Sequence, residues 1–208
     1  MSKILLSAHH IVQYFGEQKI LEFEKLTVYE GDRIGIVGSN GAGKTTLLNI
    51  LSGELVPDEG TVTRAVPVNY FKQFRAPAAQ AEPQKCRELG LSGKLSRERL
   101  SGGEMTRLGL AAMNPDSLLT FADEPTANLD AEGVELCCQL LEQYSTLLLV
   151  SHDRAVLDWL CTRILEVKDG QLHFYTGNFT AYQKQREEAF QRQEFEYQQY
   201  RSEKVRLE

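Results

Sequence analysis

The feature that most constrains this chain is a glycine-rich loop between an apolar run and a helical pattern. The run Arg33–Val37 is typical of a strand, and the sequence Gly-Ser-Asn-Gly-Ala-Gly-Lys-Thr follows it directly. This loop satisfies the G-x-x-x-x-G-K-[ST] pattern, and the helical pattern Lys44–Leu51 supplies the helix that must come after it. The sequence therefore predicts a strand, a phosphate-binding loop and a helix as one continuous unit.

The residue types of this loop suit a nucleotide bound with Mg²⁺. Glycines let backbone N–H groups converge on phosphate oxygens, and the N-terminus of the following helix favours negative charge. Lys44 is expected to reach the β- and γ-phosphates, and the Thr45 hydroxyl is expected to ligate Mg²⁺. The residues expected to bind the nucleotide here are Gly38, Ser39, Asn40, Gly41, Ala42, Gly43, Lys44, Thr45 and Thr46.

The pattern around the loop predicts an α/β fold. Two further apolar runs, Ser117–Ala122 and Thr146–Val150, indicate strands buried on both faces. Helical patterns at Glu104–Met113 and Glu132–Tyr144 separate them, and such alternation is typical of a parallel sheet. The core is therefore expected to be a parallel sheet covered by helices.

Three other segments have their own character. The runs Ile4–Tyr14 and Ile20–Tyr29 flank a Gly-Glu-Gln turn and predict an antiparallel hairpin. Residues 75–99 contain proline, glycine and charge without a clear strand, which suggests a small inserted subdomain.

The last segment has neither Gly nor Pro from Thr180 onward and carries a narrow aromatic stripe, so it predicts a long, solvated, amphipathic helix. Because the helical pattern still runs at the last residue, we expect a fragment of a longer protein.

Composition excludes several classes of protein. No apolar stretch approaches the roughly 20 residues needed to cross a bilayer, so neither a membrane span nor a signal peptide is expected. The four cysteines form no C-x-x-C pair, which argues against a zinc site and a disulfide framework and suits a reducing cytoplasm. The net charge of −6 argues against a generally basic nucleic-acid binder. Residues 171–208 hold 6 basic and 6 acidic residues, so the excess of acid lies before them.

Two adjacent carboxylates follow the apolar run that ends at Ala122. In parallel α/β sheets ligands bind at the carboxyl ends of the strands, so Asp123 is expected to hold Mg²⁺ through water and Glu124 to orient an attacking water. Such a pair alone is more often a solvated turn. The phosphate-binding loop upstream favours the functional interpretation.

A third element is Leu-Ser-Gly-Gly-Glu at residues 100–104, which leads into a helical pattern. Ser101 and Glu104 have the spacing of a capping box, which is a sufficient structural explanation for both. A capping box does not need the two glycines Gly102 and Gly103, whose exposed N–H groups would form an anion-binding surface at the helix start. The motif therefore predicts a second phosphate-binding element.

In chain order, residues 38–46, 100–104, 120–125 and the Ser-His-Asp stretch at 151–153 resemble the Walker A, signature, Walker B and switch-histidine motifs of ATP-binding-cassette ATPases. The resemblance covers residues 1 to about 175. The resemblance implies that ATP and Mg²⁺ are the cofactors. It assigns the signature role to Ser101, Gly102 and Gly103, and the catalytic roles to Glu124 and His152. The further residues that it assigns are Gln73 as the Mg²⁺-sensing and catalytic glutamine, Asp130 in the D-loop, and Phe15, with Tyr14 in reserve, as the aromatic that stacks on adenine.

The family resemblance also implies partners. Its cassettes work in head-to-tail pairs, so ATP hydrolysis is expected to require a second cassette, from the missing C-terminal half or from a homodimer. Residues 1–175 are expected to form the ATPase domain, with a helical signature subdomain at 75–115. Residues 176–208 are expected to begin an interdomain linker.

Two features look most like the ABC-F subfamily, in particular its antibiotic-resistance branch of ribosome-protection factors. They are the short span between Gln73 and Leu100 and the helix that follows Tyr175-Thr-Gly-Asn-Phe. That likeness implies a cytoplasmic protein that binds the ribosome, through rRNA and tRNA, without membrane insertion. Housekeeping ABC-F factors, the ATPase subunit of a membrane transporter and a non-hydrolysing scaffold remain alternatives. The candidate RNA contacts, each of which could instead be a solvated surface residue, are Arg97, Arg99, Arg107, Arg186, Arg192 and Arg201.

Overall fold

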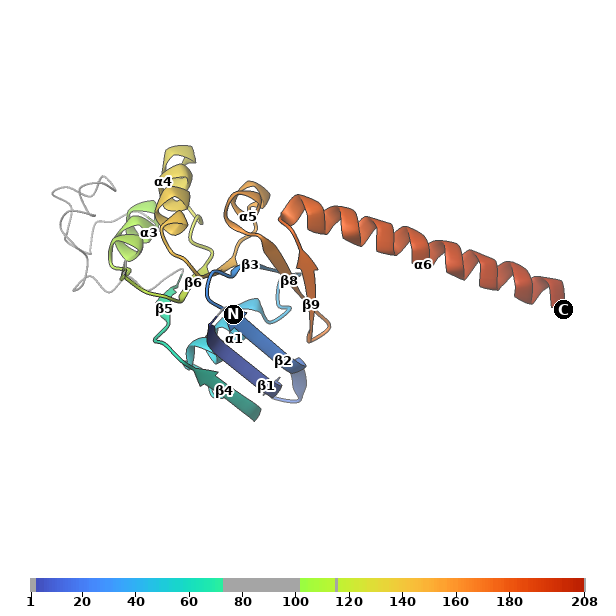
Figure 1. Cartoon of the computed structure of the whole chain (residues 1–208). Helices are drawn as coiled ribbons and strands as arrows, with labels where there is room; N and C mark the ends of the chain where they lie inside the picture. The colour runs from blue at the N-terminus through green and yellow to red at the C-terminus, as the bar shows by residue number, and fades with distance from the viewer. Residues whose placement is uncertain (1–2, 73–101, 115, 208) are drawn as a thin grey trace.

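The computed structural model describes residues 3–72, 102–114 and 116–207, and it arranges them as two β-sheets with helices packed against them (Figure 1). The larger sheet has the strand order β5-β6-β7-β3-β8-β9. All neighbours in it are parallel except the pair β8 and β9. Its strands are β3 (Arg33–Val37), β5 (Asn69–Phe71), β6 (Thr120–Asp123), β7 (Leu147–Val150), β8 (Arg163–Lys168) and β9 (Gln171–Thr176). The predicted parallel α/β core is therefore confirmed.

The smaller sheet is antiparallel and has the order β2-β1-β4. It is built from β1 (Ile4–Phe15), β2 (Gln18–Tyr29) and β4 (Glu59–Arg64). The first two strands form the expected hairpin, and Phe15 pairs with Gln18 across its turn. This sheet is the antiparallel subdomain predicted beside the nucleotide-binding core.

Five helices complete the described part of the chain: α1 (Lys44–Ser52), α3 (Gly102–Ala111), α4 (Ala131–Glu142), α5 (Arg154–Leu160) and α6 (Phe179–Leu207). Asp130 caps α4 and Asp153 caps α5, because each carboxylate accepts a backbone N–H of the first turn. Helix α6 starts against α5 and then extends away from the body, as Figure 1 shows. None of the helices in the described ranges is both long and apolar enough to cross a bilayer.

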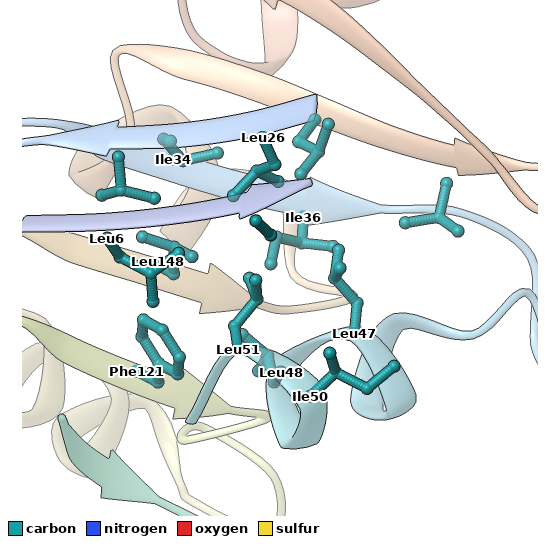
Figure 2. Packing of buried hydrophobic residues seen from close by; sticks show 14 of the residues in the cluster. Leu6, Leu26, Ile34, Ile36, Leu47, Leu48, Ile50, Leu51, Phe121 and Leu148 are labelled. Atoms are coloured by element: carbon teal, nitrogen blue, oxygen red, sulfur yellow. The ribbon is translucent and has the colours of Figure 1, made fainter. Parts of the chain in front are cut away.

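A core of aliphatic and phenylalanine side chains joins α1 to both sheets (Figure 2). Helix α1 contributes Leu47, Leu48, Ile50 and Leu51, all fully buried, and β3 contributes residues from the strand just before the loop. Burial of each such side chain stabilises the fold by about 1.5–3 kcal/mol. The phosphate-binding loop therefore connects two elements that are fixed by the same core.

A second core cluster packs α4 and α5 against the other face of the larger sheet. It contains the free thiols of Cys137, Cys138 and Cys161. Burial raises the pKa of Cys161 to about 12, so the thiol stays neutral and packs as a small apolar group. Cys86 lies outside the described residues.

Candidate functional site

The loop between β3 and α1 packs tightly against the end of β8. At Gly38 a Cβ atom would lie 2.4 Å from the carbonyl oxygen of Val167, so only glycine fits there. Gly43 occupies the N-cap position of α1 with φ 102°, and no side chain caps the helix. The first N–H groups of α1 therefore have no side-chain acceptor and can bind an anion.

The side chain of Lys44 bends back over this loop. Its Nζ donates hydrogen bonds to the carbonyl oxygens of Gly38, at 2.9 Å, and Ser39, at 3.0 Å. Burial lowers the pKa of Lys44, and the nearby carboxylates of Glu124 and Asp123 partly offset this effect. The ammonium group therefore lies at the loop, next to the two acidic residues that the sequence singled out.

Asp123 reaches the first turn of α1 from the end of β6. Its Oδ2 accepts a hydrogen bond of 2.8 Å from the Thr45 hydroxyl. Burial raises the pKa of Asp123, and the bond from Thr45 and the charge of Lys44 oppose that rise. A hydroxyl and a carboxylate that meet in this way form the oxygen donor set that Mg²⁺ prefers.

Glu124 adopts a left-handed backbone conformation, with φ 50°, which few residues other than glycine take. Its N–H donates to the carbonyl of Val150 at the end of β7 (2.9 Å), which supports this conformation. One carboxylate oxygen, Oε2, accepts a hydrogen bond of 3.4 Å from the backbone N–H of His152. The other, Oε1, is buried and accepts none, although it lies 3.4 Å from His152 Nε2.

This environment changes the acidity of Glu124. Burial raises its pKa, and the charge and backbone N–H of His152 oppose the rise. A carboxylate with a raised pKa is a better proton acceptor than an exposed one, which suits a general base. The backbone strain and the unpartnered oxygen are both consistent with a residue placed for function.

These residues fit ATP with Mg²⁺. The loop supplies backbone donors and a lysine for phosphates, and Thr45 and Asp123 supply oxygen ligands. In the described ranges no group of three or more His, Cys, Asp or Glu residues could hold a metal ion alone. Mg²⁺ sites of nucleotide enzymes use one or two protein ligands together with substrate phosphates, and Thr45 and Asp123 supply that number of ligands.

The signature residues lie at a different place, at the start of α3. A Cβ atom on Gly103 would lie 2.8 Å from the Asn128 carbonyl oxygen, so this backbone packs directly on the D-loop. Asp130 Oδ1 accepts hydrogen bonds from Gly133 N and from Arg107 Nη2, both at 2.9 Å. These bonds lower the pKa of Asp130, and the Gly133 amide contributes most to that shift. A hollow of about 460 Å³ is lined by Gly102, Gly103, Glu104, Arg107, Asn128 and Asp130.

None of the loop residues around Lys44 lines this hollow. The candidate residues are therefore brought together in two groups, one at the phosphate-binding loop and one at the signature. Gln73 and Ser101, assigned by resemblance, lie outside the described residues.

The two candidate aromatics end β1 at the turn of the hairpin. Phe15 is 55% exposed and Tyr14 is 41% exposed, so both are accessible to a ligand. The pairing of β1 with β2 is irregular between Gln13 and Tyr14, so strand alternation does not separate the two aromatics and both stay candidates.

The first turns of α6 line a hollow that sequence reasoning did not identify. This hollow has a volume of about 1020 Å³ and reaches from the phosphate-binding loop to the first turns of α6. Its lining includes Lys44 and His152 on one side and Lys184 and Arg186 on the other. No motif signalled it, because α6 looks like a solvated helix in the sequence.

Two of the candidate RNA contacts are already engaged inside the chain. Arg107 bonds to Asp130, and Arg186 lies 3.2 Å from Glu166 Oε1. Arg192 is exposed on α6. Nothing is described for the side chains of Arg97, Arg99 and Arg201.

Comparison with known proteins identifies close sequence relatives. A family model described as "ABC transporter" matches residues 21–89. The ribosome protection protein VmlR of Bacillus subtilis (strain 168) is 34% identical over 91% of this chain, which covers 36% of that relative. The erythromycin resistance ATP-binding protein MsrA of Staphylococcus epidermidis is 32% identical over 90% of the chain, which covers 40% of it.

A third relative is the energy-dependent translational throttle protein EttA of Escherichia coli O6:H1, 31% identical over 86% of the chain and with 38% of its own length covered. The chain thus spans 36% to 40% of the length of these three relatives.

Solved structures show the same fold. The ATP-binding subunit of an ABC transporter superposes with a TM-score of 0.71 at 18% identity, over 83% of this chain and 90% of that one. The ATP-binding cassette MJ0796, a dimer bound to ADP and phosphate, superposes with a TM-score of 0.68 at 22% identity, over 83% of this chain and 98% of that one. The strand order, the phosphate-binding loop and these relatives agree. The chain has the fold of an ATP-binding-cassette ATPase, and its sequence is similar to cassettes of the ABC-F type.

Proposed function

We propose that this chain is the ATP-hydrolysing cassette of a cytoplasmic ABC-F protein that binds the ribosome and confers antibiotic resistance by ribosome protection. The observation that carries the ATPase assignment is the hydrogen bond between Thr45 and Asp123, with Glu124 next in the chain. It joins the two oxygen ligands expected for Mg²⁺ at the phosphate-binding loop. ATP with Mg²⁺ supplies the phosphoanhydride bond that is hydrolysed.

Each residue of the loop site has a distinct role in this proposal. The N–H groups of the loop and Lys44 bind the phosphates, and Thr45 and Asp123 hold the ion. The Glu124 carboxylate, with its raised pKa, orients a water molecule and accepts its proton. His152, whose Nε2 lies 3.4 Å from Glu124 Oε1, fixes the position of that carboxylate.

The separation of the two groups of residues supports pairing with a second cassette. The signature glycines and Asp130 form a hollow of their own, away from Lys44. Their N–H groups at the start of α3 suit a phosphate held by another cassette. We therefore propose that hydrolysis occurs between two cassettes, with the second one from the same protein or from a second copy.

The ribosome assignment draws support from the relatives. Two of them carry the names "ribosome protection protein" and "erythromycin resistance ATP-binding protein", and their similarity extends over about nine-tenths of this chain. Helix α6 adds exposed aromatic side chains, including Phe190 and Tyr197, to a helix that leaves the body of the molecule (Figure 1). Such a helix is suited to reach a surface away from the ATPase.

Co-sedimentation with ribosomes tests this proposal. The natural full-length protein carrying Glu124→Gln, with the equivalent change in any second cassette, is expected to pellet with ribosomes when ATP is present and to stay in solution without it. Lys44→Ala, with the equivalent change in any second cassette, is the matched control, because weaker ATP binding should reduce pelleting. Reporter translation with an added macrolide then tests protection.

Absence of ATP-dependent pelleting would contradict the ribosome assignment. In that case the transporter alternative would be favoured, since the matching family model bears that description. Retention of ATP by Glu124→Gln would still support the cassette, so the two parts of the proposal can fail separately.

A further inference from the structure

Asp58 accepts two of the three hydrogen bonds in a cluster at the end of the first hairpin. It lies in the bend before β4, next to Glu59, which pairs with Val12 of β1. Its Oδ2 accepts a hydrogen bond of 2.6 Å from the backbone N–H of Tyr14 and one of 2.8 Å from the side-chain amide of Gln13. The same Gln13 amide donates to the Tyr14 carbonyl at 2.9 Å.

These bonds hold both polar backbone groups of Tyr14. The N–H is bound by a carboxylate and the C=O by an amide, so side chains hold the backbone just before Phe15 in addition to its strand pairing with Lys19. A hydrogen bond to an ionised carboxylate is stronger than a neutral one. Gln13 is itself only 4% exposed, which prevents its side chain from leaving the cluster.

The same hairpin packs against the phosphate-binding loop. Gln13 is the cross-strand partner of Leu21. A Cβ atom on Gly43 would lie 3.1 Å from Leu21 Cδ2 and 3.0 Å from Ile20 Cγ2, so these side chains touch the loop where α1 begins. The position of this hairpin relative to the phosphate-binding loop is therefore determined by packing.

We propose that Asp58, acting with Gln13, is a positioning residue for the adenine base: it locks the end of β1 so that the Phe15 ring is held ready to stack on the base. Asp58 touches no nucleotide atom in this proposal. Its effect is to reduce the conformational freedom that Phe15 would lose on binding, and preorganisation of this kind raises affinity. The inference rests on the proposed ATPase function and on the adenine-stacking role of Phe15 that the family resemblance implies.

The test compares a ligand that has the base with one that lacks it. The probes are ATP and inorganic tripolyphosphate, each with Mg²⁺, titrated into the purified chain. Asp58→Asn keeps the size of the side chain and one acceptor oxygen but removes the charge that strengthens its two hydrogen bonds. Gln13→Met removes the amide and keeps the bulk. Glu59→Gln, the same loss of charge one residue further on, is the matched control, and Phe15→Ala is the positive control.

Asp58→Asn and Gln13→Met are each expected to weaken ATP binding by about three- to tenfold. The loss of one aromatic contact changes affinity over that range. Tripolyphosphate binding should stay within about twofold, because the phosphate-binding loop is intact. A merely structural role for Asp58 would weaken both ligands together. Thermal unfolding identifies any variant that does not fold, and Gln13→Met decides the result if Asp58→Asn is that variant.

Two negative results have different meanings. If Phe15→Ala lowers the preference for ATP over tripolyphosphate but neither Asp58→Asn nor Gln13→Met does, the role of Asp58 is wrong and the adenine site stands. If Phe15→Ala leaves that preference unchanged, the adenine site itself is misassigned and the inference fails with it.

Discussion

Thr45 and Asp123 are 78 positions apart in the chain, yet the Thr45 hydroxyl donates a 2.8 Å hydrogen bond to the Asp123 carboxylate. The bond ties the first turn of α1 to the end of β6. It also keeps the Asp123 carboxylate buried. Nearby positive charges such as Lys44 offset only part of the cost of removing this carboxylate from water. The free protein therefore bears a cost that binding of a divalent cation would relieve.

The first prediction concerns this cost. Because burial raises the pKa of Asp123, the folded state binds its proton more tightly than the unfolded state does. The contribution of this carboxyl to stability is therefore fully present at low pH. It is lost as the pH rises from the unfolded value of 3.8 through the raised folded value. Asp123→Asn should increase the thermal midpoint of the nucleotide-free protein at pH 7 and abolish the stimulation of ATP binding by Mg²⁺.

Thermal unfolding between pH 5 and 8, with Mg²⁺ titrations of ATP binding, checks both parts. Asp116→Asn, at an exposed carboxylate in a loop, is the control and should change neither. A lower midpoint for Asp123→Asn would show that the carboxylate stabilises the free protein.

The second prediction concerns Lys44. Replacement by alanine removes the ammonium group that lies over the loop, and charge-assisted bonds to phosphate are worth about 1.5–3 kcal/mol each. ATP affinity should fall by roughly 10- to 100-fold. Equilibrium titration with a fluorescent ATP analogue measures the change, with Lys25→Ala on the exposed side of β2 as control. Unchanged affinity would refute the assigned role of the loop.

The third prediction separates binding from chemistry at Glu124. Glu124→Gln keeps the size of the side chain and removes its ability to accept a proton, so the rate of ATP hydrolysis should fall by about 10²- to 10⁴-fold. ATP affinity should change by less than about threefold. Phosphate release by the full-length protein gives the rate, and Glu132→Gln in the first turn of α4 serves as control. Hydrolysis at the parental rate would mean that Glu124 is not the base.

The fourth prediction contrasts the two signature glycines. At Gly103 an added Cβ would lie 2.8 Å from the Asn128 carbonyl oxygen, whereas at Gly102 the nearest atom, Asn128 Cβ, would be 3.5 Å away. Gly103→Ala should therefore destabilise the fold by about 1–3 kcal/mol. Gly102→Ala should be neutral or slightly stabilising, because alanine favours the helix. Chemical denaturation of both variants checks the contrast, and equal effects would contradict it.

The fifth prediction concerns the attachment of α6. Glu166 is 6% exposed and accepts hydrogen bonds from the hydroxyls of Tyr175, at 3.1 Å, and Tyr182, at 3.0 Å. Arg186 lies 3.2 Å from the same carboxylate. Glu166→Gln removes the charge that pairs with Arg186, and should destabilise the fold by about 1–3 kcal/mol.

Hydrogen exchange should then increase at the first turns of α6 more than in α1. The exposed Glu187→Gln on the same helix is the control. Increased exchange spread evenly over the chain would indicate a global effect and contradict a local attachment.

Much of this architecture was predictable because its signals are local. The strand Arg33–Val37 and the helix start at Lys44 are found where the sequence places them, since the apolar run and the loop glycines act within a few residues. The long α6 was predictable for the same reason: it lacks glycine and proline over its whole length. Strands β8 and β9 were not identified, because Glu166, a charged residue in the middle of β8, makes the run look exposed.

The sequence by itself determined the order of the motifs and hence the family, because each motif is a short stretch with a fixed spacing. Only the tertiary structure decided which side chains meet. It places the Asp123 carboxylate within hydrogen-bond distance of the Thr45 hydroxyl and keeps Glu124 at a positive φ next to β7. It also brings the Asp58 carboxylate to the backbone N–H of Tyr14. These contacts join residues far apart in the chain. They depend on how the two sheets and α1 share one core, which no local pattern encodes.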